Sequence, residues 1–301
     1  MKLWREGQGP EALSPLPHVN HPREEFPLHW QRWLTAIIAV PILLLVLLLG
    51  GRILFVLMIV LISGLGQWEF IGMFKPESDW VRKLYPITLG TILILSFWTI
   101  PKQAYPINPI GPVMVLVFCL FGLLLFYLLS YGHIEKVAWS LAVNALGLLY
   151  LPLLLGHLVW LRFMAQGEWW VLWLLAVIFA GDTTAFYSGK AWGEKKLYPQ
   201  VSPGKTWVGT AGGLAACLVV GILLGRQLFP QSRTVSLAWL SLLVGLLGLV
   251  GDLFESMLKR QARVKDAGSL LPGHGGMLDR LDSLLFAVPV VVYVRLFLFG
   301  T

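Results

Sequence analysis

Nine apolar runs, each close to the length of a membrane-spanning helix, dominate this chain of 301 residues. A helix needs about 20 residues to cross the hydrocarbon core of a bilayer. None of the runs alternates polar and apolar residues as the strands of a membrane barrel do. The sequence therefore predicts an all-α integral membrane protein, a polytopic helical bundle with about nine transmembrane helices. The runs are Leu34 to Gly50, Ile53 to Phe74, Leu84 to Ile100, Pro112 to Tyr131, Val137 to Leu158, Trp169 to Ser188, Trp207 to Gly225, Val235 to Phe254 and Leu281 to Phe299.

The composition and the distribution of charge support this class and give an orientation. Hydrophobic residues make up 57% of the chain and charged residues 13%, more apolar surface than a soluble domain of this size needs. If the N-terminus is cytoplasmic, 17 of the 23 Lys and Arg residues lie on the cytoplasmic side and five lie outside. This bias favours a cytoplasmic N-terminus and an external C-terminus. The net charge of +7 then reflects topology and anionic lipid or nucleotide partners, and we expect no nucleic acid.

Charged side chains are concentrated in one segment, residues 256–282, which we call the signature segment. Its sequence, SMLKRQARVKDAGSLLPGHGGMLDRLD, mixes cations with carboxylates around a glycine-rich turn. Such a combination suits a polyphosphate and its metal ion, because carboxylates hold Mg²⁺ while cations and backbone N–H groups meet phosphate oxygens. A basic cytoplasmic loop that merely follows the positive-inside rule would explain the cations. It would not explain the acids among them or the Gly-His-Gly-Gly turn.

The spacing of these residues resembles the signature of phosphatidate cytidylyltransferases (CDP-diacylglycerol synthases). The matching positions are Ser256, Lys259-Arg260, Lys265-Asp266, Pro272, His274-Gly275-Gly276, Asp279-Arg280 and Asp282. Two shorter segments also resemble the family: Asp182 to Phe186 with Gly189-Lys190, and Ser202 to Thr206. Gly204, in the second of these, stands where the family usually has Lys. Val208, two places after Thr206, stands where the family usually has Glu.

The resemblance implies specific roles for these residues. Asp252 and Asp279 would hold Mg²⁺, with a second cation possible, if the ends of two helices meet at the cytoplasmic interface. The catalytic set would be Asp252, Lys259, Asp266 and Asp279. The substrate-binding set would be Asp182, Ser202, Lys205, Thr206, Ser256, Arg260, Lys265, His274, Gly275, Gly276, Arg280 and Asp282.

The expected reaction converts CTP and phosphatidic acid to CDP-diacylglycerol and pyrophosphate, in phospholipid biosynthesis. The partners would be CTP, phosphatidic acid and membrane lipids, and a homodimer is possible. The expected location is the inner (plasma) membrane of a bacterium, with the active site in the cytoplasm. We divide the chain into a cytoplasmic tail (1–33), N-terminal transmembrane helices (34–165) and a C-terminal catalytic transmembrane region with cytoplasmic loops (166–301).

Several alternatives stay open at this level. A CTP-dependent lipid or polyprenol kinase of similar topology would release CDP and not pyrophosphate. More distantly, a transporter would spread ionisable groups along a path through the spans, whereas here they gather at one face. Lys205 either meets a phosphate or is a lysine that reaches to the membrane interface. Glu69, near the end of the second run, either lines the site or pairs with a cation.

Overall fold

The computed structural model describes residues 37, 40–75, 80–98, 110–134, 136–268, 270 and 275–299. The predicted tail (1–33) and part of the first predicted span lie outside these residues, although residues 40–48 are helical. The helices are α2 (Gly51–Phe74), α3 (Trp80–Ser96), α4 (Ile110–Leu129), α5 (Val137–Leu148), α6 (Leu154–Phe163), α7 (Gly167–Trp192), α8 (Trp207–Leu228), α9 (Thr234–Gln261) and α10 (Asp282–Val294), with a short 3₁₀ turn η2 (Leu278–Arg280). Within the described residues, each of the other eight predicted runs is mainly helical.

Six helical segments in the described part of the chain are long and apolar enough to cross a membrane. They are α2, α4, residues 137–163, α7, α8 and α9. The segment 137–163 joins α5 to α6 through a π-helical turn, η1 (Leu149–Leu153), which contains Pro152. Proline lacks the N–H that a regular α-helix needs, and a π turn accommodates that gap without ending the helix. The prediction of a polytopic helical membrane protein is confirmed.

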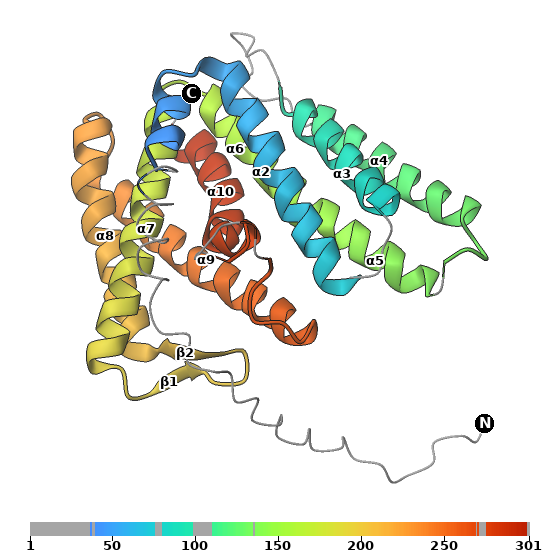
Figure 1. Ribbon diagram of the computed structural model, residues 1–301. Coiled ribbons are helices and arrows are strands. Elements are labelled where there is room, and N and C mark those ends of the chain that lie inside the picture. The colour runs from blue at the N-terminus through green and yellow to red at the C-terminus, as the bar shows by residue number, and fades with distance from the viewer. Residues whose placement is uncertain are drawn as a thin grey trace, which may run out of the picture.

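The helices form two groups around a central helix, α10 (Figure 1). Helices α7 and α8 lie side by side at one edge, and α2 to α5 make up the other side. Between them, α10 packs against α9 and against α6. Its residues Val288, Val291 and Val292 are fully buried, so the N-terminal group and the C-terminal group share one apolar core. This arrangement holds the start of α10 against α9, where the charged residues lie.

Helices α7 and α8 approach closely because glycines face the partner helix. A Cβ added at Gly213 would lie 2.9 Å from the carbonyl oxygen of Gly181, and one added at Gly209 would lie 2.6 Å from that of Ala185. Small residues at such positions let two backbones meet without intervening side chains, as is common in membrane bundles. The pairing fixes α7, which carries Asp182, against α8, which begins directly after the motif at Ser202 to Thr206.

We expect Gly213→Leu to lower the stability of the protein by about 1–3 kcal/mol, because a side chain there must force the two helices apart. Thermal unfolding of the purified protein in detergent measures this effect. Gly204→Ala is the matched control, since an added Cβ at Gly204 meets nothing within 4 Å. Equal melting temperatures for the two variants would contradict the packing described above.

A two-stranded antiparallel hairpin, which the sequence did not predict, lies between α7 and α8. It consists of β1 (Lys196–Tyr198) and β2 (Ser202–Thr206), with Lys196 opposite Thr206 and Tyr198 opposite Ser202. Thr206 caps α8, since its Oγ1 accepts a hydrogen bond of 3.1 Å from the Gly209 N–H. Arg260, at the end of α9, donates from Nε to the carbonyl oxygen of Val201 at 3.2 Å. The hairpin is therefore held to both α8 and α9.

Candidate active site

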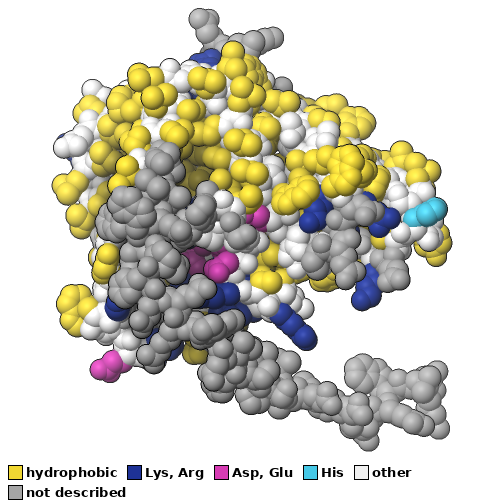
Figure 2. Space-filling model, viewed as in Figure 1, with side chains coloured by type: hydrophobic (Ala, Val, Ile, Leu, Met, Phe, Trp, Pro, Cys, Tyr) yellow, Lys and Arg dark blue, Asp and Glu magenta, His cyan; other side chains and the backbone are white. Residues whose placement is uncertain are grey.

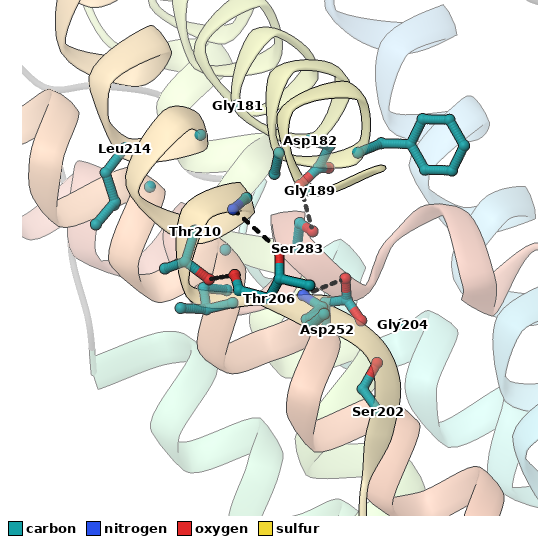
Figure 3. A pocket seen from close by; sticks show the side chains of 18 of the residues that line it. Gly181, Asp182, Gly189, Ser202, Gly204, Thr206, Thr210, Leu214, Asp252 and Ser283 are labelled. Carbon is teal, nitrogen blue, oxygen red and sulfur yellow. Dashed lines mark hydrogen bonds and ion pairs between the residues drawn. The ribbon is translucent and has the colours of Figure 1, made fainter. Parts of the chain in front are cut away.

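A cavity of about 680 Å³ lies where α7, α8, α9, the hairpin and the start of α10 meet (Figure 3). Its lining combines four acids with four bases: Asp182, Asp252, Asp279, Asp282, Lys190, Lys196, Lys205 and Arg280. The same lining includes apolar side chains, among them Ile178, Phe186, Leu214, Val244 and Leu249. Figure 2 shows the wider setting: hydrophobic side chains cover most of the upper part of this face, and Lys and Arg gather mainly in its lower half. The cavity thus has both charged and apolar walls.

Asp252 projects into the cavity from α9 and is paired with a lysine from the hairpin. Its Oδ2 lies 2.5 Å from Nζ of Lys205, and its Oδ1 accepts a hydrogen bond of 3.4 Å from the Ser256 hydroxyl. Asp252 also lies beside the start of α10. The preceding residue, Gly251, has no room for a Cβ because the carbonyl oxygen of Asp282 occupies that position. The close approach of α9 and α10 therefore depends on this glycine.

Asp279 reaches the cavity from η2, in the connection between α9 and α10, and it is the most completely hydrogen-bonded acid of the site. Its Oδ2 accepts from the backbone N–H groups of Gly276 at 2.7 Å and Ala267 at 3.0 Å. Its Oδ1 accepts from Nζ of Lys259 at 2.7 Å. Burial by itself would raise the pKa of Asp279, but the bonds from Lys259 and the two N–H groups outweigh it, and the pKa lies below its ordinary value. Asp279 is therefore ionised at neutral pH.

Lys259 bridges two carboxylates and does not line the cavity. Besides Asp279, its Nζ contacts Oε2 of Glu255 at 3.1 Å, one helical turn earlier in α9. Glu255 is completely buried, so the lysine supplies the counter-charge that a buried carboxylate requires. In this arrangement Lys259 orients Asp279, while the place in the catalytic set that we predicted for it stays a prediction.

Asp182 links α7 to the start of α10. Its Oδ1 accepts a hydrogen bond of 3.5 Å from the Ser283 hydroxyl, and Figure 3 shows the two side chains pointing toward one another. The backbone N–H of Ser283 donates in turn to Oδ1 of Asp282 at 2.7 Å. Residues from the three motifs singled out in the sequence thus converge on one cavity.

Comparison with known proteins agrees with this convergence. The family model described as "Cytidylyltransferase family" matches residues 30–298 of the chain. The chain belongs to this family. The match covers both helical groups and all three motifs, so the similarity to the family is not confined to the signature segment.

Several bacterial relatives of this cytidylyltransferase family member bear the name phosphatidate cytidylyltransferase. The protein of Pseudomonas aeruginosa is 37% identical over 265 residues, which are 86% of this chain and 94% of that one. The protein of Bacillus subtilis is 33% identical over 273 residues, covering 88% of this chain and 96% of its own length. The protein of Haemophilus influenzae is 31% identical over 290 residues, with coverage of 89% and 98%.

Of the other predicted site residues, some line the cavity and some do not. Ser202, Lys205 and Thr206 line the cavity, as do Arg280 and Asp282. Arg260, Lys265 and Asp266 are exposed and are not part of the lining. Gly275 and Gly276 lie beside Asp279, and Gly275 has φ of +79°, a conformation that favours glycine. His274 lies outside the described residues.

Sequence reasoning did not include some residues that the structure adds to the cavity. Lys190, Lys196, Thr210 and Ser283 line it, yet none was in the predicted site. Lys190 lies in the last turn of α7 and Lys196 in β1, and on the sequence alone the charge of both is equally explained by topology. Ser283 stands next to a signature residue, and only the pairing of α7 with α10 shows why a hydroxyl is useful there.

The carboxylate oxygens that line the cavity are suitable ligands for a magnesium ion. Mg²⁺ is typically bound by one or two carboxylates together with waters and substrate phosphates, and not by a complete protein cage. Within the described ranges, no group of three or more His, Cys, Asp and Glu side chains is arranged to hold a metal. Two carboxylates that line the same cavity, Asp252 and Asp279, match the smaller requirement.

Proposed function

We propose that this chain is a phosphatidate cytidylyltransferase, which joins the cytidylyl group of CTP to phosphatidic acid. The observation that carries the proposal is that, among the described residues, four acids, four bases and a set of apolar side chains line one cavity. A nucleotide triphosphate needs the cations, and a lipid substrate needs apolar walls next to them. The relatives named phosphatidate cytidylyltransferase cover nearly the whole chain and support the same activity.

The reaction is a nucleotidyl transfer. An oxygen of the phosphatidic acid phosphate forms a bond to the α-phosphorus of CTP, the bond from that phosphorus to the bridging oxygen breaks, and pyrophosphate leaves. The attacking phosphate is a monoester with a second pKa near 6 by analogy with phosphorylated side chains, so it is largely ionised at neutral pH. A strong general base is therefore not required. The main obstacle is the repulsion between two anionic substrates.

The cations of the cavity reduce this repulsion. Lys190, Lys196, Lys205 and Arg280 line it and would face phosphate oxygens of either substrate. Fixed charges that are already in place lower the barrier because they need little reorganisation as the reaction proceeds. Asp252 and Asp279 would hold Mg²⁺, which when bound supplies further charge neutralisation for the leaving pyrophosphate. Lys259 and the two N–H groups on Asp279 keep that carboxylate ionised and oriented.

The proposed orientation places the mouth of this cavity in the cytoplasm. With a cytoplasmic N-terminus, the hairpin and the signature segment lie on the side where CTP is present. The positive-inside bias of 17 cations against five supports this orientation. The apolar part of the lining would take the glycerol backbone and the first carbons of the acyl chains, with the remaining chain length in the bilayer.

The test uses purified protein in mixed detergent–lipid micelles with phosphatidic acid, CTP and Mg²⁺. We expect CDP-diacylglycerol and pyrophosphate to form in equal amounts, and to depend on Mg²⁺. A parallel reaction supplies diacylglycerol or a polyprenol as acceptor. Formation of CDP and a phosphorylated alcohol in that reaction would replace the proposal by a CTP-dependent kinase. Folded protein that turns over neither substrate would contradict both activities.

A further inference from the structure

Glu69 reaches the signature segment from α2, in the other half of the chain. The side chain is only 5% exposed, and its Oε2 accepts a hydrogen bond of 2.9 Å from the backbone N–H of Leu278. Leu278 begins η2, the turn that carries Asp279. Among the described residues, no Lys or Arg forms an ion pair with Glu69, and Glu69 does not line the cavity. The structure therefore favours neither of the two roles that the sequence left open.

The backbone of the signature segment closes directly onto the Glu69 carboxylate. A Cβ added at Gly268 would lie 2.5 Å from Oε1, and one added at Gly276 would lie 2.5 Å from Oε2. Gly268 and Gly276 stand on the two sides of the loop that connects α9 to α10. Both sides are thus in contact with one carboxylate, at positions where only glycine leaves enough space.

Asp279 joins the same two sides of this loop through neighbouring backbone groups. It accepts hydrogen bonds from Ala267, next to Gly268, and from Gly276 itself. The base of the loop is therefore fixed by two carboxylates, Glu69 from α2 and Asp279 from the loop's own end. A change at Glu69 would free Leu278 and Gly276, which are the immediate supports of Asp279.

We propose that Glu69 is a positioning residue, which fixes the base of the α9–α10 loop and thereby the direction in which Asp279 faces the cavity. It acts through the Leu278 N–H and through contact with Gly268 and Gly276, and it does not touch substrate. The catalytic consequence rests on the proposed function. The structural consequence, that α2 holds Gly268, Gly276 and Leu278 at the base of the connection, does not depend on the identity of the substrates.

The first experiment measures hydrogen exchange and kinetics on Glu69→Ala, Glu69→Gln and the control Gln67→Ala. Gln67 is equally buried on α2, but it faces Gly90 of α3 and not the loop. In Glu69→Ala we expect faster exchange of the amides of Ala267, Gly276 and Leu278, and a fall in kcat of about 10- to 100-fold, the range seen when a partner that orients a metal-binding side chain is removed. The KM for CTP should change much less.

The conservative variant and the control separate positioning from general stability. Glu69→Gln keeps an oxygen that can accept from the Leu278 N–H. It should therefore keep most of the activity and of the exchange protection that Glu69→Ala loses. Gln67→Ala should lower thermal stability without accelerating exchange in the loop. If Glu69→Ala and Gln67→Ala match in loop exchange and in kcat per folded molecule, Glu69 has only a packing role and the proposal is wrong.

A second route covers the case in which Glu69→Ala does not fold. Gly268→Ala places a methyl group against Oε1, so it should displace the carboxylate and reproduce the faster loop exchange. Normal loop protection in Gly268→Ala would overturn the proposal, and that readout is independent of whether phosphatidic acid and CTP are the substrates.

Discussion

Asp279→Asn is expected to lower kcat by about 1,000-fold while the protein remains folded. Asparagine has the same shape and keeps one oxygen that can accept from the N–H groups of Ala267 and Gly276. It removes the negative charge that Lys259 contacts at 2.7 Å and that the proposed Mg²⁺ would require. The size of the loss follows from removing a fixed charge that acts on the transition state, which costs on the order of 100- to 1,000-fold for a single group. Steady-state kinetics on CTP and phosphatidic acid measure it.

Glu194→Gln is the matched control for this variant. Glu194 is an exposed acid just before the hairpin and is not part of the cavity lining, so its replacement should leave kcat unchanged. An Asp279→Asn protein with kcat within a few-fold of the unmodified enzyme would remove Asp279 from the proposed mechanism. Hydrogen exchange should show the loop intact in Asp279→Asn, which separates loss of charge from loss of loop structure.

The lowered pKa of Asp279 also gives a prediction for acid stability. A carboxylate whose pKa is lower in the folded protein stabilises the fold at any pH above its ordinary value of 3.8. That contribution disappears as the pH falls through the lowered value, because the folded state must then be protonated. Asp279→Asn should therefore unfold with a weaker dependence on pH below about 4 than the unmodified protein. Acid titration of tryptophan fluorescence in detergent compares the two.

The apolar runs predicted the helices well because a bilayer leaves few other structures. Backbone groups in hydrocarbon must bond within their own helix, so a run such as Pro112 to Tyr131 could become only α4. The hairpin β1–β2 was missed for the complementary reason. It lies in a short polar connection, where no bilayer constrains the backbone. One of the contacts that hold it, the hydrogen bond from Arg260 to Val201, joins residues that are 59 positions apart.

Sequence reasoning reached part of the lining of the candidate cavity and none of the pairings within it. Asp182, Lys205, Asp252 and Asp279 were among the predicted residues and line the cavity, whereas Lys190, Lys196, Thr210 and Ser283 line it without having been predicted. No spacing rule shows that Lys205 pairs with Asp252, or that Lys259 supports Asp279. These pairings follow from the close approach of α7, α8, α9 and α10 at glycines such as Gly251. The contact of Glu69 with the loop joins residues 209 positions apart and is likewise a property of the tertiary fold.

Lys205→Ala is expected to lower kcat/KM for CTP on the order of 100-fold, the second large effect among these variants. The lysine lies on β2 with 21% of its side chain exposed, and its Nζ contacts Asp252 at 2.5 Å. A lysine that only extends to the membrane interface would not be held against a carboxylate inside a cavity, and its removal would cost little. Lys195→Ala is the matched control, because Lys195 is exposed next to β1 but absent from the cavity lining.

The double variant Lys205→Ala/Asp252→Asn distinguishes two ways in which Lys205 could act. If Lys205 only balances the charge of Asp252, the double variant should be no worse than Asp252→Asn, since the lysine then has nothing to neutralise. If Lys205 also binds a phosphate of CTP, removing it should raise the KM for CTP further, even when Asp252 is already asparagine. Residues in direct contact rarely give additive effects, so the comparison rests on whether a further loss remains. We expect a further rise of several-fold in KM. Lys205 lies on β2, directly before the start of α8, and the other cavity cations cannot replace a charge at that position.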